Sequence, residues 1–322
     1  MSAPAPASEQ RVAVITALAA NVAIAVAKLG AFAITGSSAM LAESLHSLAD
    51  SVNEILLLVG ARRSRRPADL RHPFGHARYR YVYAFVVSLT VFWVGGVLAV
   101  IEGVSHFAAH EPISDPRWAF GVLGLAASLE AWSLLTTVRA GRSTKGVLSW
   151  WQLLRVTKAP EVIVVFLEDL GALLGVGIAL IGLALATVTG EAAWDAVAAI
   201  AIGVLLMTIG LLVNRETQSL LVGESAAVEV VAAIRQAIAT ADGVEAVVDL
   251  RTIHVGPDDL VIAAAILVDP SQSATGIAHA IAEAEARVRR VAPFRTVMYL
   301  EPRLREAASE DASESPASEP TD

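Results

Sequence analysis

The chain has 322 residues, of which 55% are hydrophobic and 17% are charged, and it contains no cysteine. This apolar content excludes an ordinary soluble domain and indicates an integral membrane protein with several spans. The formal net charge of −8 gives no support for nucleic-acid binding. The lack of cysteine excludes disulfides, iron–sulfur clusters and thiolate metal sites, so any metal would need histidine, carboxylate, amide or water ligands.

Six apolar segments are each close to the ~20 residues that a membrane-spanning helix needs. They cover residues 12–34, 39–61, 80–104, 117–138, 162–187 and 193–213. The loops after the second and fourth segments are rich in Lys and Arg, whereas the loops near 35–38, 105–116 and 188–192 contain neither residue. The positive-inside rule therefore predicts that both termini are cytoplasmic. The Ala/Arg/Val-rich composition favours a bacterial plasma membrane.

Beyond Asn214 the composition becomes that of a small soluble domain. Apolar periodicity predicts an αββαβ order there, a ferredoxin-like arrangement. The expected elements cover residues 226–241, 244–254, 260–268, 273–291 and 295–300. We thus expect a short cytoplasmic N-terminus (1–11), a six-helix transmembrane domain (12–213), a cytoplasmic dimerisation domain (214–305) and a disordered acidic tail (306–322).

The second apolar segment contains the stretch GSSAMLAESLHSLADSVNE, in which His46 and Asp50 are four residues apart. They share one face of a helix, and an ionisable pair at bilayer depth indicates a functional site. A neutral histidine and an aspartate are both good zinc ligands. Glu43 and Asn53 flank the pair at i−3 and i+3. Hydrogen bonding that orients the pair is favoured for both over direct ligation, which remains open.

The fifth segment places two adjacent carboxylates, Glu168 and Asp169, in the middle of an apolar helix. Adjacent helical residues point about 100° apart, so at most one aims squarely at a shared site. Asp169 lies beside the small residues Gly171 and Ala172, which favour close helix packing, and it is the first expected ligand. The expected N/O site consists of His46, Asp50, Asp169 and Glu168. Glu168 could instead pair with another helix or be protonated.

Three further features carry polar or amphipathic groups in or beside the apolar segments. Lys28 lies near the end of the first segment, where its side chain is expected to snorkel to the interface. Glu130 lies mid-span in the fourth segment and needs a partner, for which Lys28 is a candidate; a transport role is slightly less favoured. The stretch SWWQLLRV at residues 149–156 is expected to lie on the cytoplasmic leaflet.

Taken together, these motifs resemble the cation diffusion facilitators, a family that exports divalent metals in exchange for protons. The resemblance covers nearly the whole chain, and it rests on the second-segment stretch, HPFGHARYRY, Asp169, LRTIHVGP, AHAIAEAEARV and YLEP. Family members usually carry another ligand four residues before the fifth-helix aspartate, where this chain has Val165. The Glu168–Asp169 pair after KAPE resembles the branch of zinc transporter 9, and Glu168 is the natural compensation.

The resemblance also implies further metal sites and a V-shaped homodimer. A second family site lies in the loop after the second segment, and the matching residues are Asp69, His72 and His76. An alternative is that Gly75 makes a turn there and the histidines cap the third helix. A third family site, in the C-terminal domain, is largely absent, because only His279 and Glu301 match it.

The expected function is therefore proton-coupled efflux of a divalent cation, most often Zn²⁺, by alternating access at a midplane site. Mn²⁺, Co²⁺, Fe²⁺ and Ni²⁺ are further candidate substrates, and no prosthetic group is expected. His46 is the natural proton exchanger because histidine titrates near neutral pH. The alternative is a non-transporting scaffold or regulator, motivated by the incomplete fifth-helix ligand pair. An enzyme is not expected, since the chain lacks an HExxH motif.

Overall fold

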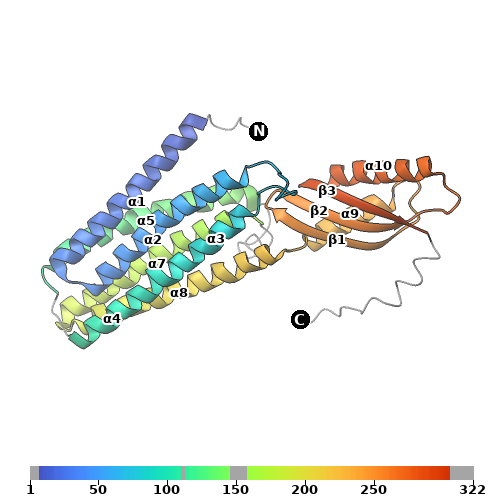
Figure 1. Ribbon diagram of the computed structural model, residues 1–322. Helices are drawn as coiled ribbons and strands as arrows, with labels where there is room; N and C mark the ends of the chain where they lie inside the picture. The colour runs from blue at the N-terminus through green and yellow to red at the C-terminus, as the bar shows by residue number, and fades with distance from the viewer. Residues whose placement is uncertain (1–6, 110–112, 146–157, 305–322) are drawn as a thin grey trace. The chain divides into compact units, whose positions relative to one another are not determined.

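The computed structural model describes residues 7–109, 113–145 and 158–304 (Figure 1). The chain divides into two compact units, Met1–Gln218 and Ser219–Asp322. The interfacial segment expected at 149–156 and the tail expected at 306–322 lie outside the described residues.

The first unit consists of long helices (Figure 1). Their residue ranges are close to those of the predicted apolar segments. In chain order they are α1 (Ala7–Thr35), α2 (Ser38–Ser64), α3 (Tyr79–Thr90), the π-helix η1 (Val91–Val97), α4 (Leu98–Ala109), α5 (Pro116–Lys145), α7 (Pro160–Thr189) and α8 (Ala193–Val222). Because α3, η1 and α4 follow one another without a break, they correspond to a single apolar segment of the sequence.

Four of these helical stretches have the length and hydropathy to cross a membrane. They are Tyr79–Ala109, Pro116–Arg139, Pro160–Thr189 and Ala193–Val222. A shorter apolar helical segment covers Asn21–Thr35. Within the described ranges α2 is not in this group, because Glu43, His46 and Asp50 interrupt its apolar residues. The first unit is thus a helical membrane domain with four candidate spans.

The polarity of this unit is typical of a protein in lipid. Large apolar side chains such as Val26, Ile181 and Leu211 are exposed on its surface. Lys28 and Glu43, by contrast, are fully buried between helices. Lipid tails can cover apolar side chains, whereas ionisable groups at bilayer depth need internal partners. Lys28 and Glu43 therefore face the interior of the bundle.

The start of α2 is fixed by a contact with α8. Gly36 has a positive φ of 68°, which ends α1, and Ser37 then caps α2 by accepting a hydrogen bond from the backbone N–H of Met40. Ser37 Oγ also donates to Asp195 Oδ1 at 2.6 Å, and Ser38 Oγ donates to Asp195 Oδ2 at 2.9 Å. Asp195 is buried. The helix that carries His46 and Asp50 is therefore anchored at its first turn.

The π-helix η1 packs directly on α8. A Cβ atom added to Gly96 would lie 2.9 Å from the backbone nitrogen of Met207, and one added to Gly203 would lie 2.8 Å from the carbonyl oxygen of Gly96. Only glycine permits such a close approach of two backbones. These glycines let α8 pack closely against the third apolar segment.

The second unit is a small mixed sheet with two helices. Its elements are α9 (Val228–Ala239), β1 (Ala246–Gly256), β2 (Asp259–Leu267), α10 (Ala274–Val291) and β3 (Arg295–Arg303). The strand order is β1-β2-β3, in which β1 pairs antiparallel with β2 and β2 pairs parallel with β3. A parallel pair needs a crossover, which α10 supplies. The core includes Ile234 from α9, Ile262 and Ile266 from β2, and Val288 from α10.

Candidate metal centre

A cavity of about 780 Å³ lies between α1, α2, α5 and α7. Six carboxylates line it, namely Asp50, Glu54, Glu130, Glu161, Glu168 and Asp169. Within the described part of the chain, none of the lining residues is Lys, Arg or His. A cleft lined by one sign of charge concentrates counter-ions. Glu161 is paired with Arg80, and the remaining carboxylates give the cavity an excess of acidic groups that favours cations.

The cavity occupies one half of the helix bundle. Its lining residues on α2 fall within 47–61, those on α5 within 129–136 and those on α7 within 161–172. These are the portions of the three helices that adjoin the two basic loops of the sequence. We call this the basic-loop side and the other half the far side. The carboxylates are thus grouped toward the basic-loop side.

His46 and Asp50 share one face of α2, as their spacing predicts. His46 Nδ1 lies 3.5 Å from Asp50 Oδ1, and the His46 side chain is only 1% exposed. Within the described structure, neither ring nitrogen of His46 has a hydrogen-bond partner, and neither does Asp50 Oδ1. Buried polar atoms are nearly always hydrogen-bonded, so these atoms are candidate positions for contact with a metal ion or an ordered water. Asp50 lines the cavity, whereas His46 does not.

The two adjacent carboxylates of α7 contact different helices. Glu168 Oε1 accepts a hydrogen bond from the amide of Asn53 on α2 at 2.6 Å. Asp169 accepts hydrogen bonds from two hydroxyls of α5, Ser133 Oγ at 3.0 Å and Thr137 Oγ1 at 2.6 Å. This divergence follows from the angle between neighbouring helical residues. Asn53 therefore orients Glu168, and Glu168 is the carboxylate that is joined directly to the helix of His46 and Asp50.

Lys28 does not snorkel, so that expectation is wrong. Its side chain is 0% exposed, and Nζ donates to Glu43 Oε2 at 2.8 Å and to Ser47 Oγ at 2.8 Å. Its direct partner is therefore Glu43 and not Glu130. The short turn at Gly36 makes α1 and α2 antiparallel neighbours, which brings Lys28 level with Glu43. One oxygen of Glu43 is thus engaged, which leaves Oε1 alone available to a metal ion.

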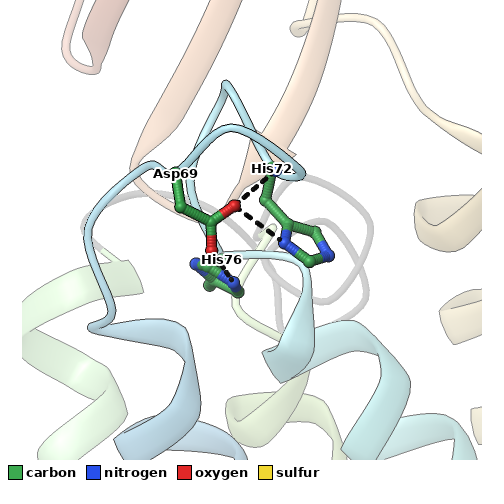
Figure 2. A group of neighbouring side chains, drawn as sticks. All are labelled: Asp69, His72 and His76. Atoms are coloured by element: carbon green, nitrogen blue, oxygen red, sulfur yellow. Dashed lines mark hydrogen bonds and ion pairs between the residues drawn. The ribbon is translucent and has the colours of Figure 1, made fainter.

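A second cluster lies in the loop between α2 and α3 (Figure 2). Asp69 Oδ1 is 3.2 Å from His72 Nδ1, and Asp69 Oδ2 is 3.6 Å from His76 Nε2. Across the described ranges, this is the only group of three or more His, Asp or Glu side chains whose ligand atoms all lie within 4.8 Å of one another. The residues expected at the midplane are less tightly gathered in this conformation.

The loop cluster has features of a metal site and none of a helix cap. His76 Nδ1 lies 3.1 Å from the carbonyl oxygen of Pro67. Since a carbonyl can only accept, neutral His76 carries its lone pair on Nε2, the atom that faces Asp69. The backbone N–H groups of His72 and Arg71 donate to Asp69, and they lower the pKa of its carboxyl group. No side-chain cap is formed at the start of the described helix α3, so the alternative, capping by the histidine side chains, is not observed.

Ser133 and Thr137 were not singled out from the sequence, although a signal was present. They are four residues apart in the fourth apolar segment and so share one helix face. Hydroxyls on one face of an apolar helix predict a polar partner inside the bundle. Asp195 was also missed, because its Ser37 and Ser38 partners are distant in sequence.

Residues 14–222 match the cation efflux transmembrane domain. The chain is 30% identical over 233 residues to the human proton-coupled zinc antiporter SLC30A9, mitochondrial, a match that covers 71% of this chain and 41% of that protein. The Xenopus laevis protein of the same name is 29% identical over 232 residues, with the same coverage. Metal tolerance protein C4 of Arabidopsis thaliana is 27% identical over 248 residues, covering 76% and 54%.

The chain thus spans about two fifths of the length of the SLC30A9 relatives. The domain match extends over more than half of the chain and includes all of the residues that line the acidic cavity. On these grounds the chain belongs to the cation diffusion facilitators, a family of transporters and not of enzymes, and within that family to the branch of zinc transporter 9.

Proposed function

We propose that this chain transports divalent metal ions, with Zn²⁺ as its main substrate, in exchange for protons. The observation that carries the proposal is the acidic cavity that reaches Asp50 beside His46, whose ring nitrogens have no hydrogen-bond partner among the described residues. Relatives named proton-coupled zinc antiporters support zinc and proton coupling. Mn²⁺, Co²⁺, Fe²⁺ and Ni²⁺ are secondary candidates, since an N/O site tolerates them.

The proposed midplane ligands are His46, Asp50, Glu168 and Asp169. Glu168 takes precedence over Asp169, because Asn53 joins Glu168 to α2, whereas the hydrogen bonds of Asp169 direct it toward α5. Since a metal binds deprotonated ligands, loading displaces protons, and protonation from the far side releases the metal. His46, which lies 3.5 Å from Asp50, is the proposed proton exchanger.

The proposed membrane domain has six spans, with α1 and α2 added to the four candidate spans. Both termini then lie on the basic-loop side, which the positive-inside rule makes cytoplasmic. We further propose that the second unit, Ser219–Asp322, pairs with that of a second copy to form a homodimer. The bacterial plasma membrane is proposed from composition alone, and the SLC30A9 relatives, which are mitochondrial, do not support it.

Purified protein in proteoliposomes tests the transport proposal. An imposed pH gradient should drive zinc accumulation against its own gradient, with protons moving in the opposite direction, and reversal of the pH gradient should reverse zinc movement. Internal fluorescent zinc and pH indicators measure both fluxes. Protein-free liposomes are the control. A scaffold would show no zinc flux above that control at any pH gradient, and that outcome would contradict the proposal.

We also propose that Asp69, His72 and His76 bind a divalent ion in the loop. Their geometry and the tautomer fixed by Pro67 support it. Asp69→Asn should weaken zinc binding at this site at least about tenfold. Because the pKa of Asp69 is lowered, its carboxylate stays charged as the pH falls toward 5, so protonation of Asp69 should not cause zinc loss in that range. Calorimetric zinc titration at several pH values measures this.

Asp50→Asn is the matched control for the loop site, since it leaves the loop residues intact. That variant should retain the zinc ion that Asp69→Asn loses. Equal stoichiometry and affinity in wild-type protein and Asp69→Asn would show that the loop holds no metal.

A further inference from the structure

The acidic cavity ends at a charged layer that the transport site does not use. On α2 the lining residues stop at Ser47, and on α7 they stop at Ala172. The next turn of α2 toward the far side carries Glu43, which is bonded to Lys28 of α1. Both side chains are 0% exposed. The cavity is therefore closed toward the far side by an ion pair as well as by apolar packing.

Three helices meet in this layer. Lys28 Nζ joins α1 to α2 through Glu43 Oε2 and Ser47 Oγ, both at 2.8 Å. The remaining oxygen of Glu43 lies against Gly175 of α7, where a Cβ atom would have no room. Ser47 belongs to the cavity wall, so a single ammonium group links the wall to the layer behind it. Beyond the layer, Ala31 and Ala179 are buried.

The charge of Lys28 matters to a cation in the cavity. Its ammonium group interacts electrostatically with Asp50 and Glu130 as well as with Glu43. A divalent ion that moves from Asp50 toward the far side must therefore pass the Lys28–Glu43 ion pair. A buried ion pair also resists the loss of one partner, because the other charge would be left without compensation. Passage to the far side thus requires that the pair separate or move as a unit.

We propose that Lys28, acting through Glu43 and Ser47, is a positioning residue for transport that keeps the far side closed while the site faces the basic-loop side. Separation of Lys28 from Glu43 is the event that opens the site to the far side. This inference rests on the proposed transport function. It assigns to the two buried charges a role in the direction of transport, distinct from metal ligation.

The absence of cysteine from the chain allows a direct test with single-cysteine reporters. Thr136→Cys reports on the cavity wall, and Ala179→Cys reports on the buried region beyond the ion pair. The full-length protein is placed in zinc-free proteoliposomes and treated with a membrane-impermeant maleimide from each side. In the otherwise wild-type protein, Thr136→Cys should be labelled from the basic-loop side and Ala179→Cys should be protected.

Lys28→Met leaves Glu43 without its counter-charge, which should draw water into the layer. Ala179→Cys should then be labelled from the far side at least about tenfold faster. Glu43→Gln, which preserves shape, should have the same effect. The exchanged pair Lys28→Glu with Glu43→Lys should restore protection. Labelling of Thr136→Cys should stay unchanged throughout, which shows that the bundle remains folded.

Continued protection of Ala179→Cys in both single variants would overturn the proposal. Equal labelling of both reporters from both sides, with no recovery in the exchanged pair, would also overturn the proposal. That result would show that the Lys28–Glu43 pair only stabilises the fold. Since labelling uses no zinc, its outcome is independent of the flux assay. Wild-type protein that shows the predicted labelling but no zinc flux would refute the transport function instead.

Discussion

Replacing Asp50 with alanine will abolish zinc flux and will weaken zinc binding in the membrane domain at least about 100-fold. Asp50 is the residue that combines exposure to the acidic cavity with proximity to His46, whose ring nitrogen is 3.5 Å away. Its removal leaves a neutral imidazole and carboxylates of a different helix, too few ligands on α2 to hold the ion. Flux in proteoliposomes and calorimetric titration in an Asp69→Asn background measure the two effects.

Glu54→Gln is the matched control for Asp50→Ala. Glu54 lies one turn further along α2 and lines the same cavity, and its carboxylate accepts a hydrogen bond from Asn21 at 3.3 Å. Its neutralisation lowers the negative potential of the cavity without removing a proposed ligand, so zinc affinity should change less than about tenfold. Wild-type flux in Asp50→Ala, or equal losses in the two variants, would contradict the proposed site.

Glu168→Gln will reduce zinc flux at least about tenfold more than Asp169→Asn. Both substitutions preserve size and remove one charge from the same turn of α7, so they form a matched pair. Asn53 of α2 holds Glu168 toward α2, whereas Ser133 and Thr137 hold Asp169 toward α5. The comparison needs initial rates of zinc uptake at several zinc concentrations.

The pattern of effects discriminates between the two carboxylates. A larger loss in Asp169→Asn would restore the assignment that helix packing first favoured. Equal losses would show that both carboxylates bind the ion. Affinity that falls with an unchanged maximal rate would indicate a lost ligand, whereas an unchanged affinity with a lower rate would indicate a role in the conformational change.

The sequence was sufficient for the helix positions and for the shared face of His46 and Asp50, because both depend on local periodicity. It could not determine which α7 carboxylate faces α2. That choice depends on the rotation of α7 about its axis, which is set by contacts with α5 such as Ser133–Asp169. Adjacent polar residues carry no periodic signal that would fix such a rotation.

The partner of Lys28 was misassigned for a different reason. Glu130 is a candidate partner because it is an isolated mid-span charge. The short turn at Gly36 nevertheless limits the choice of partner more strongly, because it fixes which α2 residues lie level with Lys28. In an antiparallel helix pair, residues at similar distances from the turn lie at the same depth, since each residue rises by about 1.5 Å. Lys28 and Glu43 meet this condition, and the structure pairs them at 2.8 Å.

The contact between Asp195 and the start of α2 has a consequence for biogenesis. Ser37 and Asp195 are 158 residues apart in the chain, and synthesis delivers the N-terminal residue long before its partner. The hydroxyls of Ser37 and Ser38 therefore form other hydrogen bonds, to water or to other groups, until α8 has entered the membrane. The helix that carries His46 and Asp50 reaches its final register only when the last long helix of the domain is in place.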